Sequence, residues 1–120
     1  MMVNGFPNMF TITGPGSPSV IGNVPLNIEQ HVEFISDLIE RQRARGIERI
    51  EVSTEAEQSW GKAVADIANE TLFVLADSWY MGANIPGKPR LCYPYIGGSN
   101  RFRQICDEIA TNGYTGFVFV

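Results

Sequence analysis

The sequence has almost none of the residues that bind transition metals. Its 120 residues include two cysteines, Cys92 and Cys106, and one histidine, His31. Structural zinc sites take four Cys or His ligands and catalytic zinc sites take three protein ligands. We therefore expect no metal site of the usual composition. So few cysteines are typical of a reducing compartment, which makes the cytoplasm the expected location.

Long apolar runs and an excess of basic charge are also missing. No stretch approaches the ~18 consecutive apolar residues of a membrane span. Residues 1–10 lack the basic start of a signal peptide. Lys and Arg number 9 against 13 Asp and Glu, for a net charge of -4. Nucleic acids and anionic membranes attract basic surfaces, so we expect neither as a partner.

Charge is absent from the beginning of the chain, where the first charged residue is Glu29. This segment carries apolar side chains such as Phe6 and Phe10 instead of the charged or low-complexity sequence of a solvated tail. Residues 116–120 (GFVFV) form an apolar run that suits a strand covered on both faces. We therefore expect a piece of a larger protein. A small domain with buried termini is the alternative.

The apolar pattern predicts a helix-dominated α/β fold with three main helices and short strands. Helical periodicity and N-cap residues mark the helices, alternation marks the strands, and Gly/Pro clusters mark the loops. The expected elements are a strand at 8–13, a helix from between Asn23 and Asn27 to Gly46, a strand at 48–52, a helix from Thr54 with its apolar stripe reaching Leu72, a loop at 82–94, a helix from Ser99 or Asn100 to Asn112, and a final strand.

Two glycine-rich segments invite comparison with phosphate-binding loops. The first, residues 14–19, lies between an expected strand and an expected helix, but Ser19 replaces the third glycine and two prolines remove backbone N–H groups. A rigid turn, or a close backbone approach to a flat ligand, suits it better. The second, residues 82–88, has P-loop spacing, but Pro89 stands where Ser or Thr would bind magnesium, so that match is accidental.

Several other polar and aromatic residues are candidates for a functional role, each weighed against a structural one. Trp79 lies in a Gly/Pro-rich region, where a large aromatic serves either recognition or anchoring. Lys88 belongs to a stiff basic loop that is either solvated or binds a phosphate-bearing ligand. His31 lies between helix carboxylates and is expected to be solvated or locally paired. Cys106 lies on an apolar stripe and is expected to be inert core. No pair of residues suggests acid–base or nucleophilic catalysis.

Several long stretches resemble one enzyme family. They are residues 5–19 (GFPNMFTITGPGSPS), 78–90 (SWYMGANIPGKPR), 103–108 with 112–117, and the helix segment 27–33 (NIEQHVE). Together they resemble the C-terminal part of flavin-dependent Baeyer–Villiger monooxygenases of the cyclohexanone and phenylacetone monooxygenase type. The resemblance covers nearly the whole chain, and the motifs occur in the same order.

This resemblance implies a function for residues 1–120 as the C-terminal portion of an FAD-binding domain, with a nucleotide-covering loop at about 78–90. The implied reaction inserts oxygen next to a ketone carbonyl through a C4a-peroxyflavin, using FAD and NADPH. The implied pocket residues are Ser19, Val20 and Ile21 on the substrate side of the flavin, Asn23 and Val24 near its ring system, and Trp79 and Lys88 toward NADP.

The family places its active-site arginine and its dinucleotide fingerprints upstream of this segment, so we expect no catalytic residue here and no activity from the chain alone. The missing dinucleotide-binding domains are the expected partners, and self-association would follow from uncovered apolar surface. A non-catalytic interaction or oligomerisation module derived from the same fold is the main alternative. A small nucleotide-binding domain is a further one.

Overall fold

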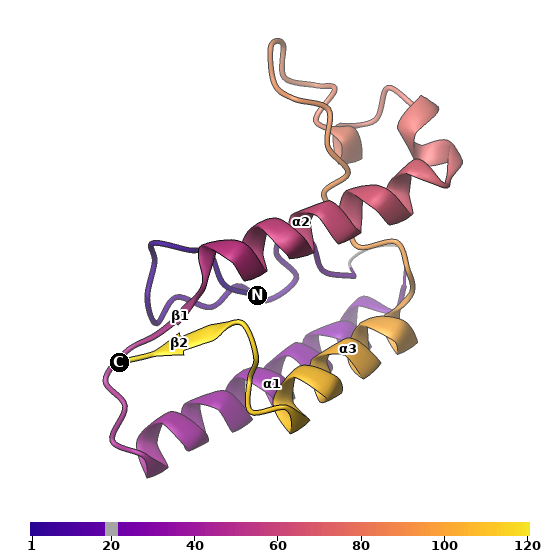
Figure 1. Ribbon diagram of the computed structural model, residues 1–120. Helices are drawn as coiled ribbons and strands as arrows, with labels where there is room; N and C mark the ends of the chain where they lie inside the picture. Colours follow the sequence, from indigo (N-terminus) through magenta and orange to yellow (C-terminus); the bar gives the residue numbers. More distant parts are fainter. Residues whose placement is uncertain (19–21) are drawn as a thin grey trace.

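The computed structural model describes residues 1–18 and 22–120. Three helices, α1 (Val24–Ala44), α2 (Thr54–Asn69) and α3 (Ser99–Thr111), carry most of the regular structure. Helices α1 and α3 pack side by side, and α2 lies on the other side of the N-terminal segment (Figure 1). The predicted helix-dominated α/β fold is confirmed.

The ends of α1 follow from local chemistry. The Asn23 side chain accepts a hydrogen bond from the Leu26 N–H, and Pro25 occupies the first turn, where a missing N–H costs nothing. Arg41 and Arg43 lie in the last turn, where cations complement the helix dipole. Gly46 follows with a φ of +64°. Both predicted ends of this helix are confirmed.

Helix α2 is shorter than its apolar stripe predicted. Its N-cap is Ser53, one residue before the expected cap, and it ends at Asn69. The Thr71 hydroxyl donates to the Ala68 carbonyl and accepts from the Phe73 N–H, which starts a separate 3-10 turn, η1 (Leu72–Leu75). Leu72 is consequently 80% exposed and not part of the core, which corrects the prediction.

The strand expected at residues 8–13 does not form. Asn8 and Thr13 have φ values of +59° and +54°, which a strand cannot accommodate. Asn8 instead bridges to Ile50, donating its backbone N–H to the Ile50 carbonyl while its side-chain oxygen accepts the Ile50 N–H. A side chain that satisfies the neighbouring strand in this way replaces the expected ladder of backbone hydrogen bonds.

The two predicted strands that do form pair with each other. Strands β1 (Ile50–Val52) and β2 (Phe117–Phe119) are antiparallel, with Ile50 opposite Phe119. A core rich in aromatic residues lies beneath them and between the helices. Its buried members are Phe34, Leu38, Ile50, Val64, Tyr95, Phe102, Cys106 and Tyr114. Cys106 is therefore in the core, as predicted.

The sequence predicted Ser99 or Asn100 as the N-cap of α3, but the helix already begins at Ser99 and its N-cap is Gly98, with no side-chain cap. The region between α2 and α3 contains a second 3-10 turn, η2 (Trp79–Met81), and a loop through residues 82–94 that projects beyond the end of α2 (Figure 1). The predicted loop is confirmed. Among the described residues, none belongs to a helix that is both long and apolar enough to cross a membrane.

Candidate cofactor-facing pocket

One pocket of about 350 Å³ brings three distant segments together. It lies where the N-terminal loop, the start of α1 and the loop region after α2 meet. Its lining residues are Thr13, Gly14, Pro15, Ser17, Val24, Trp79, Tyr80, Tyr93 and Pro94. Two residues that the family resemblance singled out, Val24 and Trp79, are therefore on the same pocket although they are far apart in sequence.

The wall of this pocket is the Thr13–Ser17 loop, which is held by hydrogen bonds at several points. The Gly16 N–H donates to the Tyr93 carbonyl at 2.6 Å, and the Gly16 carbonyl accepts from Trp60 Nε1 at 3.0 Å. The Ser17 carbonyl accepts from the Tyr95 N–H at 3.1 Å. Loop backbone fixed at both ends by other elements is a rigid wall, not a mobile segment.

Trp79 covers the pocket from the opposite segment and is 61% exposed. Its ring stacks on Tyr80, with the centroids 4.0 Å apart. The buried anchor of η2 is instead Met81. Of the two interpretations of Trp79, buried anchor or recognition residue, the structure excludes the first within this chain.

The loop that follows Trp79 is fastened at its base. Arg90 bonds to the Asp77 carboxylate at 2.6 Å and to the Ala76 carbonyl at 2.8 Å. The Tyr93 N–H donates to the Tyr80 carbonyl at 2.9 Å. These contacts fix both ends of the segment between Asp77 and Tyr93.

Two further predicted cofactor residues do not line the pocket. The Lys88 ammonium lies 4.7 Å from the centroid of the Tyr93 ring, a cation–π contact that places it beside a lining residue. Asn23 uses its side chain to cap α1. The predicted substrate-side residues Ser19, Val20 and Ile21 lie outside the described residues.

Sequence reasoning missed three residues of this pocket, namely Thr13, Tyr93 and Pro94. The signal available for Tyr93 was its place in an aromatic and proline-rich run before α3. No local pattern could show that this run lies against residues 13–17, because the contact depends on how the helices pack.

His31 is not the solvated or locally paired residue that its neighbours suggested. It is 0% exposed, and its Nδ1 accepts a hydrogen bond from the Thr13 N–H at 3.0 Å. The Phe102 ring lies against the imidazole edge to face, with the centroids 5.4 Å apart. Burial lowers the pKa of His31, and the nearby Met1 amino group lowers it further.

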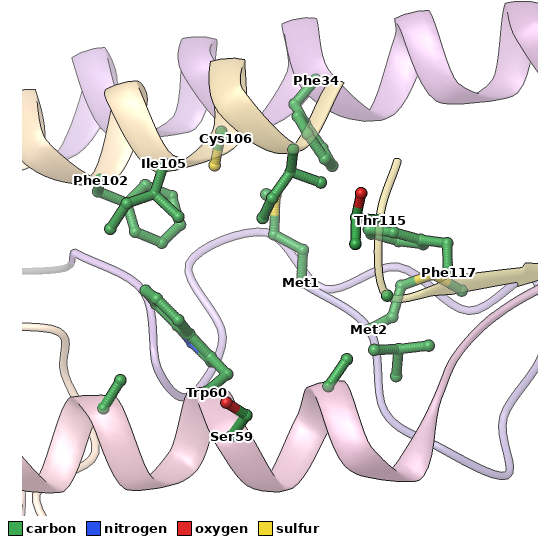
Figure 2. A pocket seen from close by; sticks show the side chains of 15 residues that line it. Met1, Met2, Phe34, Ser59, Trp60, Phe102, Ile105, Cys106, Thr115 and Phe117 are labelled. Carbon is green, nitrogen blue, oxygen red and sulfur yellow. The ribbon is translucent and has the colours of Figure 1, made fainter. Parts of the chain in front are cut away.

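A second, apolar cavity of about 350 Å³ opens between α2 and α3 (Figure 2). Met1 and Met2 enter it from the N-terminus; Met1 lies in the middle of the cavity below α3, and Met2 lies beside Phe117 (Figure 2). Burial raises the pKa of the Cys106 thiol beside it, so this cysteine is neutral and unreactive at neutral pH. Among the described residues, no three His, Cys, Asp or Glu side chains cluster as metal ligands would.

Comparison with known proteins identifies the relatives of this chain. No family model matches it. Cyclohexanone 1,2-monooxygenase from Acinetobacter sp. is 44% identical over 115 residues, covering 96% of this chain and 21% of that protein. A Baeyer–Villiger monooxygenase from Pseudooceanicola batsensis is 38% identical over 98% of this chain and 21% of its own length. An FAD-binding monooxygenase from Byssochlamys spectabilis is 34% identical over 95% of this chain and 20% of its length.

Solved structures that are similar to this chain belong to the same group of enzymes. A cyclohexanone monooxygenase from Rhodococcus sp. Phi1 bound to NADP⁺ superposes with a TM-score of 0.92 at 39% identity, over 98% of this chain and 22% of that one. A closed structure of a cyclohexanone monooxygenase superposes with a TM-score of 0.93 at 42% identity, over 99% of this chain and 22% of that one. An open structure superposes with a TM-score of 0.80 at 34% identity, over 99% of this chain and 19% of that one.

In fold and sequence the chain is therefore similar to one part of the flavoprotein monooxygenases. More narrowly, the chain is homologous to one segment of the Baeyer–Villiger monooxygenases, as its motifs predicted. It spans about a fifth of the length of the curated relatives that it matches.

Proposed function

We propose that this chain forms part of an FAD- and NADPH-dependent monooxygenase that inserts oxygen next to a ketone carbonyl. The observation that carries the proposal is the pocket in which the Thr13–Ser17 loop and Val24 face Trp79. The relatives support this proposal, because they are named Baeyer–Villiger, cyclohexanone and FAD-binding monooxygenases. In this proposal residues 1–120 are a portion of the FAD-binding domain, and residues 78–90 cover the nucleotide.

The residues of the pocket fit a flat, partly apolar cofactor. The loop offers glycine and proline backbone, which a planar ring system can approach closely. Trp79 stacks on Tyr80 and still leaves over half of its surface open for a second planar group. A flavin bound there would supply the activation of oxygen, and NADPH would supply the electrons.

Individual residues take separate roles in this proposal. The Thr13–Ser17 loop and Val24 form the wall toward the flavin, and Ser19, Val20 and Ile21 are the proposed contacts to the ketone. Trp79 covers the nicotinamide nucleotide and excludes water. Lys88, now held over Tyr93, reaches the nucleotide phosphate when the loop closes. Asn23 acts indirectly, because it fixes the start of α1 beside Val24.

Among the described residues, the pocket lining holds no carboxylate, imidazole or amine; its polar side-chain groups are the hydroxyls of Thr13, Ser17, Tyr80 and Tyr93 and the indole N–H of Trp79. The Ser17 hydroxyl already donates to the Gly14 carbonyl at 2.6 Å. The groups that drive the reaction must then come from the rest of the enzyme. We accordingly propose that the chain alone is inactive.

A chimera tests the function. The matching segment of the Acinetobacter cyclohexanone 1,2-monooxygenase would be replaced by this chain, which is feasible at 44% identity. We expect the chimera to retain FAD and to oxidise NADPH faster when cyclohexanone is added. The 120-residue chain alone should retain no FAD through gel filtration, because a pocket open on one side loses most of its ligand burial. A folded chimera that binds FAD but produces no lactone would contradict the proposal.

The interaction-module alternative rests on a separate observation, the exposed leucines of η1. Leu72 and Leu75 are both largely exposed, next to the end of α2. Apolar patches of this kind promote association. If the chain served only for assembly with other proteins, this surface would form the interface. If the chain belongs to an intact monooxygenase, the remainder of that protein would cover the same surface.

We therefore expect the 120-residue chain to self-associate. Sedimentation velocity over a range of concentrations should show a growing oligomer fraction, and Leu72→Ser with Leu75→Ser should shift it toward monomer. Glu55→Ser on the exposed start of α2 is the matched control and should leave the distribution unchanged. A wild-type chain that stays monomeric throughout would count against both the uncovered surface and the alternative.

A further inference from the structure

His31 is buried, and the cofactor chemistry proposed above does not use it. It lies on α1, and its Nδ1 accepts a hydrogen bond from the Thr13 N–H at 3.0 Å. An imidazole nitrogen that accepts a hydrogen bond carries no proton, so the neutral ring must hold its proton on Nε2. Nε2 has no hydrogen-bond partner among the described residues. Among the described residues, the hydrogen bond that Nδ1 accepts from Thr13 is therefore the one that the imidazole makes.

Thr13 needs such an acceptor because its backbone is strained. Its φ of +54° lies in the left-handed region, which β-branched residues rarely adopt. Strained residues persist where the surrounding structure holds them, and they cluster at functional sites. Thr13 also begins the loop that forms the pocket wall. The hydrogen bond to His31 thus holds the strained end of that wall.

We propose that His31 is a positioning residue: through Nδ1 it holds Thr13, and thereby sets the Thr13–Ser17 loop against the cofactor-facing pocket. The remaining ties of the loop act further along, at Gly16 and Ser17. Only the identity of the pocket's ligand rests on the proposed function. The positioning itself is a property of this chain.

Protonation of Nδ1 would place a donor against the Thr13 N–H donor and release that end of the wall. The Met1 amino group acts on His31, and Glu29 and Glu33 lie two residues before and after it on α1, both exposed. Glu33 is already paired with Arg103 at 3.1 Å. No Asp or Glu is buried in the part of the chain that the structure describes, so no buried carboxylate there favours the charged form of the imidazole.

Nuclear magnetic resonance on the ¹⁵N-labelled 120-residue chain tests this directly. Because the chain has one histidine, its ring signals are unambiguous. At neutral pH we expect the Nε2–H tautomer. As the pH falls, the amides of Thr13 and Gly14 should shift together with the ring, at a midpoint below the ordinary value of about 6.5. The Asn8 amide, bound to Ile50, is the internal control and should not follow.

Two variants separate positioning from general packing. His31→Asn keeps an acceptor near the Nδ1 position, whereas His31→Gln carries its amide further out, near Nε2. We expect hydrogen exchange at the Thr13 amide to be about 5- to 150-fold faster in the Gln variant than in the Asn variant, as expected when a buried donor loses its partner. The Asn8 amide should exchange alike in both.

An Nδ1–H tautomer in the wild-type chain, or equal Thr13 exchange in the two folded variants, would overturn the proposal. Neither measurement uses a cofactor, so these outcomes do not depend on the proposed function. If instead the NMR results are as expected and the chimera is inactive, the proposed function fails and the positioning role stands.

Discussion

Replacing Gly16 with alanine is expected to lower the free energy of unfolding by about 2 to 5 kcal/mol, combining backbone strain with overpacking. Gly16 has a φ of +76°, where an L-residue is strained. A Cβ added there would lie 2.7 Å from Trp60 Nε1, the atom that donates to the Gly16 carbonyl. Either the ring or the loop must move, and the hydrogen bond between them weakens. Urea unfolding followed by circular dichroism measures the loss.

Gly46→Ala is the matched control for this effect. Gly46 has a similar φ of +64°, but a Cβ there would meet nothing within 4 Å. Its substitution should cost only the backbone strain, about 1 to 2 kcal/mol. The excess loss at Gly16 therefore measures the contact between the loop and Trp60. Equal losses at the two positions would show that Trp60 does not constrain the Thr13–Ser17 loop.

The helices could be predicted because their signals are local. Asn23 and Pro25 begin α1, and the apolar spacing that follows needs no knowledge of the rest of the chain. The wrong prediction at Leu72 also came from a local signal. The apolar spacing of α2 continues past Thr71, but the Thr71 hydroxyl bonds to the Ala68 carbonyl where the helix ends. The missing strand at 8–13 shows the opposite limit. Its residues suit a strand, but Asn8 uses its side chain to bond a distant strand end.

The pocket was predictable only in part. The resemblance to a known family singled out Val24 and Trp79, and the structure brings both to one pocket. Tyr93 and Thr13 join them through packing between distant segments, which no local pattern reveals. His31 did have a signal: it lies three residues before Phe34 and seven before Leu38, on the face of α1 that is buried. Its acidic neighbours Glu29 and Glu33 obscured that position.

The largest functional effect is expected at Trp79. In the chimera, Trp79→Ala should lower lactone formation and raise the hydrogen peroxide released per NADPH, with bound FAD unchanged. Losing the packing of a large ring, together with the hydrogen bond that its indole N–H would donate to the bound nucleotide, would weaken the closed state by roughly 1–3 kcal/mol. That corresponds to about a 5- to 150-fold change in the closed population or in nucleotide affinity. Product, peroxide and flavin content would be measured on one preparation.

The structure argues that this variant will fold. Trp79 is mostly exposed, and the core beneath it is anchored by the buried Met81. Leu91→Ala is the matched control, because it also truncates an exposed apolar residue of the same region but lies outside the pocket lining. It should leave the ratio of peroxide to lactone unchanged.

The two outcomes for Trp79 separate a covering role from a structural one. A ring that excludes water and holds the nucleotide controls where the electrons of NADPH go, so its loss changes the coupling between oxidation and product. A ring needed only for packing would instead reduce stability and flavin content, and the enzyme that survived would stay coupled. Because Trp79 stacks on Tyr80 and leaves its other side open, the first outcome is the one that its geometry supports. Normal coupling at normal flavin occupancy would remove Trp79 from the site.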